Sequence, residues 1–106
     1  MPKFMIHASY TSEGVKGVRS KGGSSRREAI SDMLEGLGGS LECLYFSFGD
    51  ADVVVIADLP DNEAATAVAL TVNAAGGAAT KTYPLITPEE VDAAAQRSVS
   101  YTAPGG

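Results

Sequence analysis

The side chain best suited to moving a proton near neutral pH is His7, the single histidine among the 106 residues. Imidazole has an ordinary pKa close to neutrality, so His7 could serve as a general base or as an axial ligand to haem. A histidine on a strand is more often a packed, hydrogen-bonded side chain, and the sequence identifies no second ligand or partner for it. The sequence therefore favours a structural role for His7 and keeps a catalytic role as the alternative.

Two carboxylates, Asp50 and Asp52, flank Ala51 in a polar segment between two apolar runs. Paired carboxylates could share a proton or hold a metal ion. Aspartate is also common in turns, where it bonds to nearby backbone, and this role is favoured for Asp50. Asp52 begins an apolar strand, so it needs hydrogen-bond donors, which segment 10–14 or a ligand could supply. We predict that Asp52 is a candidate ligand-binding residue.

A candidate anion site lies in segment 22–27, which reads GGSSRR. Backbone N–H groups at an expected helix start, together with the guanidinium groups of Arg26 and Arg27, are groups that bind anions. The segment lacks the spacing and the lysine-threonine ending of a Walker phosphate loop. The alternative is a solvated, mobile loop.

Three tyrosines, Tyr10, Tyr45 and Tyr83, could line a pocket with His7, although tyrosine is ordinary at half-buried strand positions. Gly14 is grouped with them because glycine lets another backbone or a ligand approach closely. The sequence holds no zinc pattern, nucleophile elbow or dinucleotide fingerprint. We therefore predict no cofactor and no metal.

The composition is that of a soluble globular domain, with 44% apolar and 20% charged residues. The net charge of −5 argues against nucleic-acid binding, although five of the eight basic residues fall between Lys16 and Arg27. Cys43 stands alone, so we expect an inert core thiol and a reducing compartment. No signal peptide or bilayer-spanning run is evident, so we expect a cytoplasmic protein without membrane association.

Alternation of apolar residues predicts strands over 4–10, 41–48, 52–57 and 79–86. In the first, the even-numbered residues from Phe4 to Tyr10 share one face; in the second, Leu41, Cys43 and Tyr45 share one face. Pro84 places the last strand at an edge or a bulge.

Helical spacing and capping residues predict a short helix or turn at 11–18 and helices at 25–37, 62–75 and 88–97. The expected N-caps are Thr11, Ser25, Asp61 and Thr87. The 62–75 helix is so poor in charge that we expect burial around most of its circumference.

The order β-α-β-β-α-β-α predicts an α+β, ferredoxin-like βαββαβ fold with an additional C-terminal helix and a four-stranded antiparallel sheet. We expect one domain over residues 1–97 and a flexible tail over 98–106. Right-handed crossovers would place the main helices on one face of the sheet. Residues 53–56, Val-Val-Val-Ile, nevertheless supply apolar side chains to both faces. A homodimer or higher homo-oligomer, with two sheets packed face to face, would cover the second face.

Several short motifs occur in order along the chain: Phe4-Met5-Ile6 through Tyr10-Thr11 with Gly14-Val15, then Gly49-x-x-Asp52 before a valine-rich strand, then Pro60-Asp61 before an alanine-rich helix. Together they resemble the GYD-domain family over roughly residues 3 to 95. That family is similar to dimeric α/β-barrel proteins, so the resemblance implies a dimeric α/β barrel. An aromatic residue is typical before the aspartate, and Ala51 stands there, which implies a wider or altered pocket if that ring lines one.

Three functions follow as hypotheses. The first is a homodimeric protein that binds a small, partly apolar ligand in a cleft near the dimer interface, either between the sheet and the first helix or inside the barrel, close to His7, Tyr10 and Asp52. The second is a small cofactor-independent enzyme, an isomerase or monooxygenase, in which His7 takes a proton from the substrate. The third is an oligomerisation module with no ligand.

Overall fold

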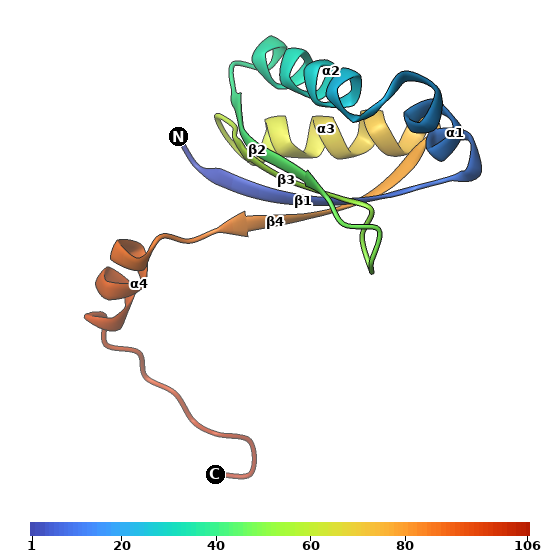
Figure 1. Ribbon diagram of the computed structural model, residues 1–106. Coiled ribbons are helices and arrows are strands. Elements are labelled where there is room, and N and C mark those ends of the chain that lie inside the picture. The colour runs from blue at the N-terminus through green and yellow to red at the C-terminus, as the bar shows by residue number, and fades with distance from the viewer.

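The computed structural model describes residues 1–106 and shows a four-stranded antiparallel sheet covered on one face by three helices (Figure 1). The sheet order is β2-β3-β1-β4, which confirms the predicted α+β, ferredoxin-like fold with an additional C-terminal helix. In chain order the elements are β1 (Lys3–Tyr10), α1 (Ser12–Lys21), α2 (Gly23–Gly36), β2 (Ser40–Phe46), β3 (Val53–Asp58), α3 (Asn62–Ala75), β4 (Ala78–Leu85) and α4 (Pro88–Ala95).

The core lies between the sheet and the helices. β1 is a central strand; its Ile6 pairs with Val55 of β3 on one side and with Thr82 of β4 on the other. Alternate residues of β1 and β3 are buried, as a strand with one covered face requires. The buried apolar side chains are Phe4, Ile6, Ala8, Ile30, Leu34, Val53, Val55, Ala57, Leu59, Ala65, Val68 and Ala78.

The opposite face of the sheet is uncovered in the single chain. The residues that alternate with the buried ones include Met5, Val54 and Ile56, which are half-buried, and Tyr45 and Tyr83, which are 72% and 41% exposed. This face is predominantly apolar, as the run of β-branched residues at 53–56 predicts. The dimeric barrel inferred from it stays a prediction.

The junction between α1 and α2 differs from the prediction. α1 continues to Lys21, and α2 already begins at Gly23, so Ser25 lies inside the first turn of α2 and does not cap it. Gly22 has φ 87°, a conformation that glycine adopts at little cost, and this reverses the chain within one residue. No side chain caps α2. Thr11, by contrast, caps α1 as predicted.

β2 contains an irregularity that shifts its facing. Leu41 pairs with Ala57, but Cys43 pairs with the next residue, Ile56, so Glu42 is an extra residue on the β2 side. Leu41 therefore packs against the core, and the prediction that it shares a face with Cys43 and Tyr45 was wrong. A strand pattern alone cannot show a bulge, because one extra residue inverts the alternation beyond it.

α3 and α4 begin at the predicted caps. Asp61 accepts a hydrogen bond from the Ala64 backbone N–H (2.9 Å), and Thr87 forms a capping box at the start of α4. α3 is less buried than predicted: only Ala65 and Val68 are fully enclosed, because α3 packs on one face of the sheet and nothing covers its outer side. β4 is an edge strand, which explains how it accommodates Pro84. No helix in the chain has the length and apolar character that crossing a membrane requires.

Candidate functional site

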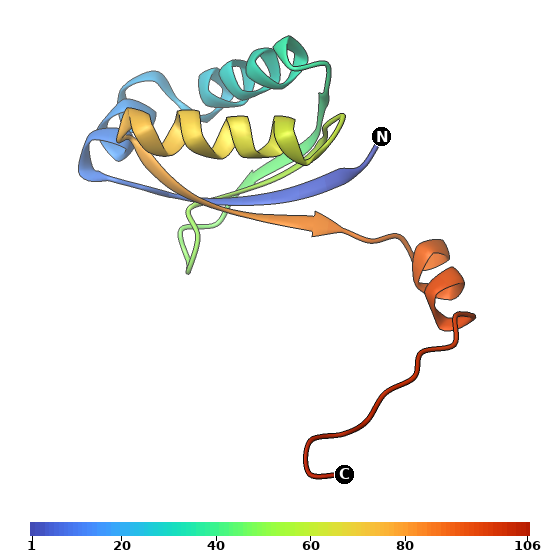
Figure 2. The same ribbon diagram turned by 180° about the vertical axis from the view of Figure 1, so that it is seen from behind.

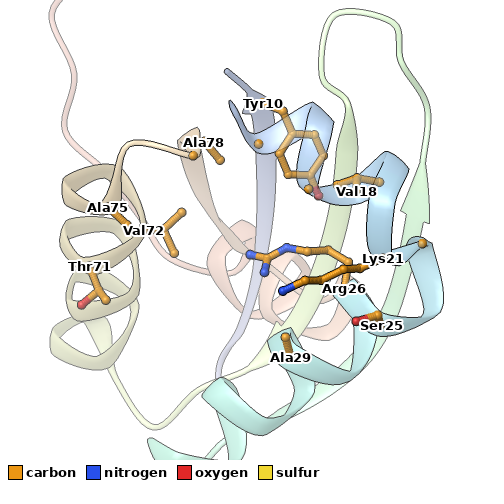
Figure 3. Close-up of a pocket in the computed structure, with 14 residues that line it drawn as sticks. Tyr10, Val18, Lys21, Ser25, Arg26, Ala29, Thr71, Val72, Ala75 and Ala78 are labelled. Carbon is orange, nitrogen blue, oxygen red and sulfur yellow. The ribbon is translucent and has the colours of Figure 1, made fainter. Parts of the chain in front are cut away.

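A cavity of about 490 Å³ lies at one end of the helical layer. α1 closes that end, while α2 packs on β2 and α3 on β4, so a gap remains between the two longer helices. Many of the facing residues are glycine or alanine and do not fill the gap. The lining residues are Tyr10, Gly14, Gly17, Val18, Lys21, Gly22, Ser25, Arg26, Ala29, Thr71, Val72, Ala75, Gly77 and Ala78 (Figure 3).

The wall formed by α1 is fixed by its start. The Thr11 backbone N–H donates to the Gly77 carbonyl oxygen (3.0 Å), and the Thr11 hydroxyl donates to the Gly76 carbonyl oxygen (3.0 Å). Gly14 lies so close to the Gly77 carbonyl oxygen that a Cβ atom at position 14 would overlap it. These contacts bind α1 to the turn between α3 and β4, so the cavity has a rigid rim.

Tyr10 ends β1 and carries its ring over the cavity. Its backbone N–H donates to a carboxylate oxygen of Asp52 (2.8 Å), and the Asp52 backbone N–H donates to the Ala8 carbonyl oxygen (2.9 Å). The Tyr10 hydroxyl oxygen is shielded from solvent and has no hydrogen-bond partner. A buried hydroxyl without a partner is unfavourable, so this group would gain a hydrogen bond from a ligand that reaches it.

Two cations point into the same space. In Figure 3 the side chains of Lys21 and Arg26 extend from the junction of α1 and α2 into the cavity, and the Tyr10 hydroxyl points toward them. Neither cation has a carboxylate partner, because the ion pairs of the chain both involve Lys3. No acidic residue lines the cavity. The arrangement therefore favours an anion over a neutral or cationic group.

The start of α2 adds to this positive potential. α1, α3 and α4 each carry an acidic residue in the first turn, whereas α2 carries none and has no side-chain cap. The positive end of the α2 dipole is thus not compensated by its own sequence, and Gly22 and Ser25 of this region line the cavity.

The floor of the cavity is apolar. A smaller hollow of about 40 Å³ continues beneath α2 and shares Tyr10, Arg26, Val72 and Ala78 with the cavity. Its other walls are mostly core side chains such as Ile6, Ile30 and Val55. The site thus combines a cationic mouth with an apolar floor.

The candidate residues from the sequence do not come together in one place. Tyr10, Gly14 and Arg26 meet at the cavity. His7, Tyr45 and Tyr83 belong to the uncovered face of the sheet. There the His7 ring stands edge-on to the Tyr83 ring with centroids 5.3 Å apart.

The two remaining candidates lie elsewhere. Asp52 binds backbone at the end of β1. Arg27 is exposed and does not line this cavity.

The structure does not bring His7 to Tyr10 or Asp52, because odd and even positions of β1 face opposite sides of the sheet. His7 is absent from the side-chain hydrogen bonds of the chain and lies outside the cavity. No group of three or more His, Cys, Asp or Glu side chains could hold a metal ion.

Lys21 is the main site residue that was missed. Its position in the last turn of a helix is usual for a cation and gives no sign of a ligand. The clustering of basic residues between Lys16 and Arg27 was the available sign, but only the geometry of the junction separates Lys21 and Arg26 from their neighbours.

The amino-acid sequence matches the family model of the GYD domain over residues 4–95, nearly the whole chain. This match confirms the resemblance that the short motifs indicate. No curated protein matches the sequence.

Proposed function

We propose that this chain, which belongs to the GYD-domain family, binds a small, partly apolar anion in the cavity between α1, α2 and α3. The observation that carries the proposal is the buried Tyr10 hydroxyl, which lacks a partner and faces a cavity that also receives two unpaired cations. A carboxylate or phosphate would accept hydrogen bonds from all three groups at once.

The volume of the cavity and its apolar floor indicate which class of anion would fit. About 490 Å³ suits a small organic molecule. The charged groups lie at the mouth, whereas the hollow beneath α2 is lined mostly by apolar side chains. We therefore expect the anionic group at Tyr10, Lys21 and Arg26, with an apolar part directed toward the floor. This location is on the helix side of the sheet beside α1, which is one of the two locations expected from the sequence, and differs from the interior of a barrel at a dimer interface.

A ligand-binding role is favoured over the two alternatives. A purely structural module does not require a cavity of this size with unpaired donors, which are unfavourable when empty. An enzyme that uses His7 requires a second polar group placed for proton transfer beside a substrate cavity, and His7 instead stacks edge-on with Tyr83 outside the cavity.

Isothermal titration calorimetry tests the proposal with four probes: acetate, benzoate, octanoate and inorganic phosphate. We expect benzoate or octanoate to bind more tightly than acetate, and the neutral amides of the same acids to bind at least about tenfold more weakly. Native mass spectrometry of the protein as purified would show any retained anion directly.

Arg26→Gln and Arg27→Gln form a matched pair of variants. Both remove one positive charge from neighbouring positions of α2, but only Arg26 lines the cavity. Arg26→Gln should weaken binding of the best anion about tenfold or more, and Arg27→Gln less than about threefold. Equal losses in the two variants would mean nonspecific attraction to a basic surface and would refute the site.

We further propose that the protein is a homodimer in which the uncovered sheet faces of two copies pack together. The support is the row of apolar side chains on that face, among them Val54, Ile56 and Tyr45. Burying such side chains contributes about 1.5–3 kcal/mol each. Native mass spectrometry reports the subunit count in the same experiment, and a monomer at every concentration would refute the dimer.

A further inference from the structure

Residues 86–106, called here the C-terminal arm, stand clear of the rest of the chain. Figures 1 and 2 show α4 and the following segment projecting beyond the end of β4 without touching the helical layer. Every residue of the arm is exposed, and no hydrogen bond joins it to residues 1–85. The exposed side chains include Ile86 (67%), Val91 (54%) and Tyr101 (75%).

The sequence of α4 is typical of a helix that packs against another apolar surface. Its start has a capping box and Pro88 at the first turn, so the sequence specifies the helix strongly. Val91, Ala94 and Ala95 have the i, i+3, i+4 spacing of an apolar stripe. A helix of 8 residues is marginal in water without tertiary packing. The single chain offers this stripe no partner surface.

The exposed area indicates how much surface a partner should cover. A compact monomer of 10.9 kDa exposes about 5,600 Å², whereas this chain exposes 7266 Å². Its radius of gyration is 17.0 Å, against about 13 Å for a compact domain of this length. The excess area of about 1,700 Å² per chain exceeds the 800 Å² or so that each partner buries in a standard interface and falls in the range of obligate homodimers.

The direction of the arm identifies the partner. Both views place the arm on the side of the sheet away from the helices, which is the side of the uncovered face (Figures 1 and 2). A second copy packed on that face would therefore lie next to the arm. A helix of about 12 Å in length is too short to cover a four-stranded sheet by itself, so folding back would leave most of the face exposed.

The charges agree with this placement. The arm carries Glu89, Glu90 and Asp92 in α4. Lys81 belongs to the uncovered face, opposite His7 in the pairing of β1 and β4, and has no carboxylate partner in the single chain. An acidic helix from a second copy would supply one.

We propose that the C-terminal arm is an exchanged element: in a homodimer, the apolar stripe of α4 from each copy packs against the other copy beside the joined sheets. By two-fold symmetry the exchange is reciprocal, so each chain both gives and receives an arm. The proposal rests on the sheet-face homodimer above and goes beyond it, since two sheets could pair with both arms free.

The test compares two full-length variants that place the same charge on either side of α4. Val91→Asp alters the apolar stripe, whereas Ala93→Asp lies off it. Sedimentation equilibrium should show the dimer dissociation constant raised at least about tenfold by Val91→Asp and changed less than about threefold by Ala93→Asp. Circular dichroism at matched concentrations reports whether each variant is folded.

Hydrogen exchange of the unaltered chain supplies a second measurement that needs no variant. Amides of 89–95 should exchange slowly where the dimer predominates and rapidly on dilution to monomer. A dimer with rapidly exchanging arm amides and equal effects of the two variants would refute the exchange and leave the sheet-face dimer intact. A monomer at all concentrations would refute both.

Discussion

At the scale of single residues, Tyr10 shows how the fold fixes one part of a side chain's surroundings and leaves another part open. Its backbone N–H donates to Asp52, which ties the end of β1 to the residue before β3. Its hydroxyl has no partner, although it is shielded from solvent. This hydroxyl lowers the stability of the empty protein and would gain a hydrogen bond when a ligand is bound. Such groups are expected at sites that are selected for binding and not for stability.

Tyr10→Phe should therefore have opposite effects on stability and on binding. Removal of an unsatisfied buried hydroxyl should stabilise the empty protein by about 1 kcal/mol, and loss of the donor should weaken anion binding about five- to tenfold. Urea unfolding and calorimetry measure the two effects, with Tyr45→Phe on the exposed face as the control. A destabilised variant with unchanged affinity would show that the hydroxyl has a structural role.

The two glycines that face the cavity from α1 should respond differently to alanine. Gly14→Ala places a Cβ against the Gly77 carbonyl oxygen, whereas a Cβ at Gly17 meets no atom within 4 Å. We expect Gly14→Ala to destabilise the fold by about 1–3 kcal/mol, and Gly17→Ala to stabilise it by up to about 1 kcal/mol through helix propensity. Similar values from urea unfolding would show that α1 does not need its close contact with the turn before β4.

At the scale of elements, the starts of helices are predicted well from the sequence. The face of the sheet on which each side chain lies is predicted less well. Asp61 and Thr87 mark helix starts because a side-chain cap is a local interaction between residues three apart. The bulge at Glu42 is not local, since it is defined by the pairing of β2 with β3. One extra residue there moved Leu41 to the core.

The same limit applies to the candidate site. The alternation along β1 already places Tyr10 on the helix side, so its location was predictable. The choice of Arg26 over Arg27 was not, because the two point in directions about 100° apart on a helix. The start of α2 depends on the single conformation of Gly22. Lys21 enters the site only because α1 ends at Lys21, three residues beyond the end of the helix or turn predicted at 11–18.

Lys3 connects three strands and should make stability depend on alkaline pH. Hydrogen bonds from its ammonium to Glu42 on β2, and then to Asp58 on β3 (3.0 Å), raise the pKa of Lys3 above its usual value of 10.5. The charged form is thus favoured in the folded state. Its contribution is complete below the unfolded pKa and is lost as pH rises through the folded one.

Lys3→Met tests this dependence. The stability difference between the unaltered chain and the variant should be constant near neutrality and should shrink above about pH 10.5. The side chain is exposed, so the difference itself should be small and sensitive to salt. Urea unfolding at a series of pH values measures it. A difference that instead grows with alkaline pH would contradict the assigned sign.

At the scale of the whole molecule, charge is divided between two regions. The chain carries a net charge of −5, yet five of its eight basic residues lie in α1 and the first turns of α2, and two of them, Lys21 and Arg26, line the cavity. A localised positive region attracts small anions at short range. Salt at physiological concentration weakens the repulsion from acidic residues farther away than about 8 Å.

Assembly should make thermal stability depend on protein concentration. If a second copy covers the uncovered sheet face, unfolding separates the chains, and the melting temperature must rise with protein concentration. We expect a rise of roughly 3–5 °C for each tenfold increase in concentration. Val54→Asp, on the uncovered face, should abolish this dependence. Leu70→Asp is the control, because Leu70 is an apolar side chain on the outer side of the helical layer, 68% exposed, and lies far from the uncovered face. If Leu70→Asp abolished the dependence and Val54→Asp did not, the two copies would meet through α3. The apolar side chains on the uncovered sheet face would then have to be buried by some other contact, because their exposure to water is unfavourable.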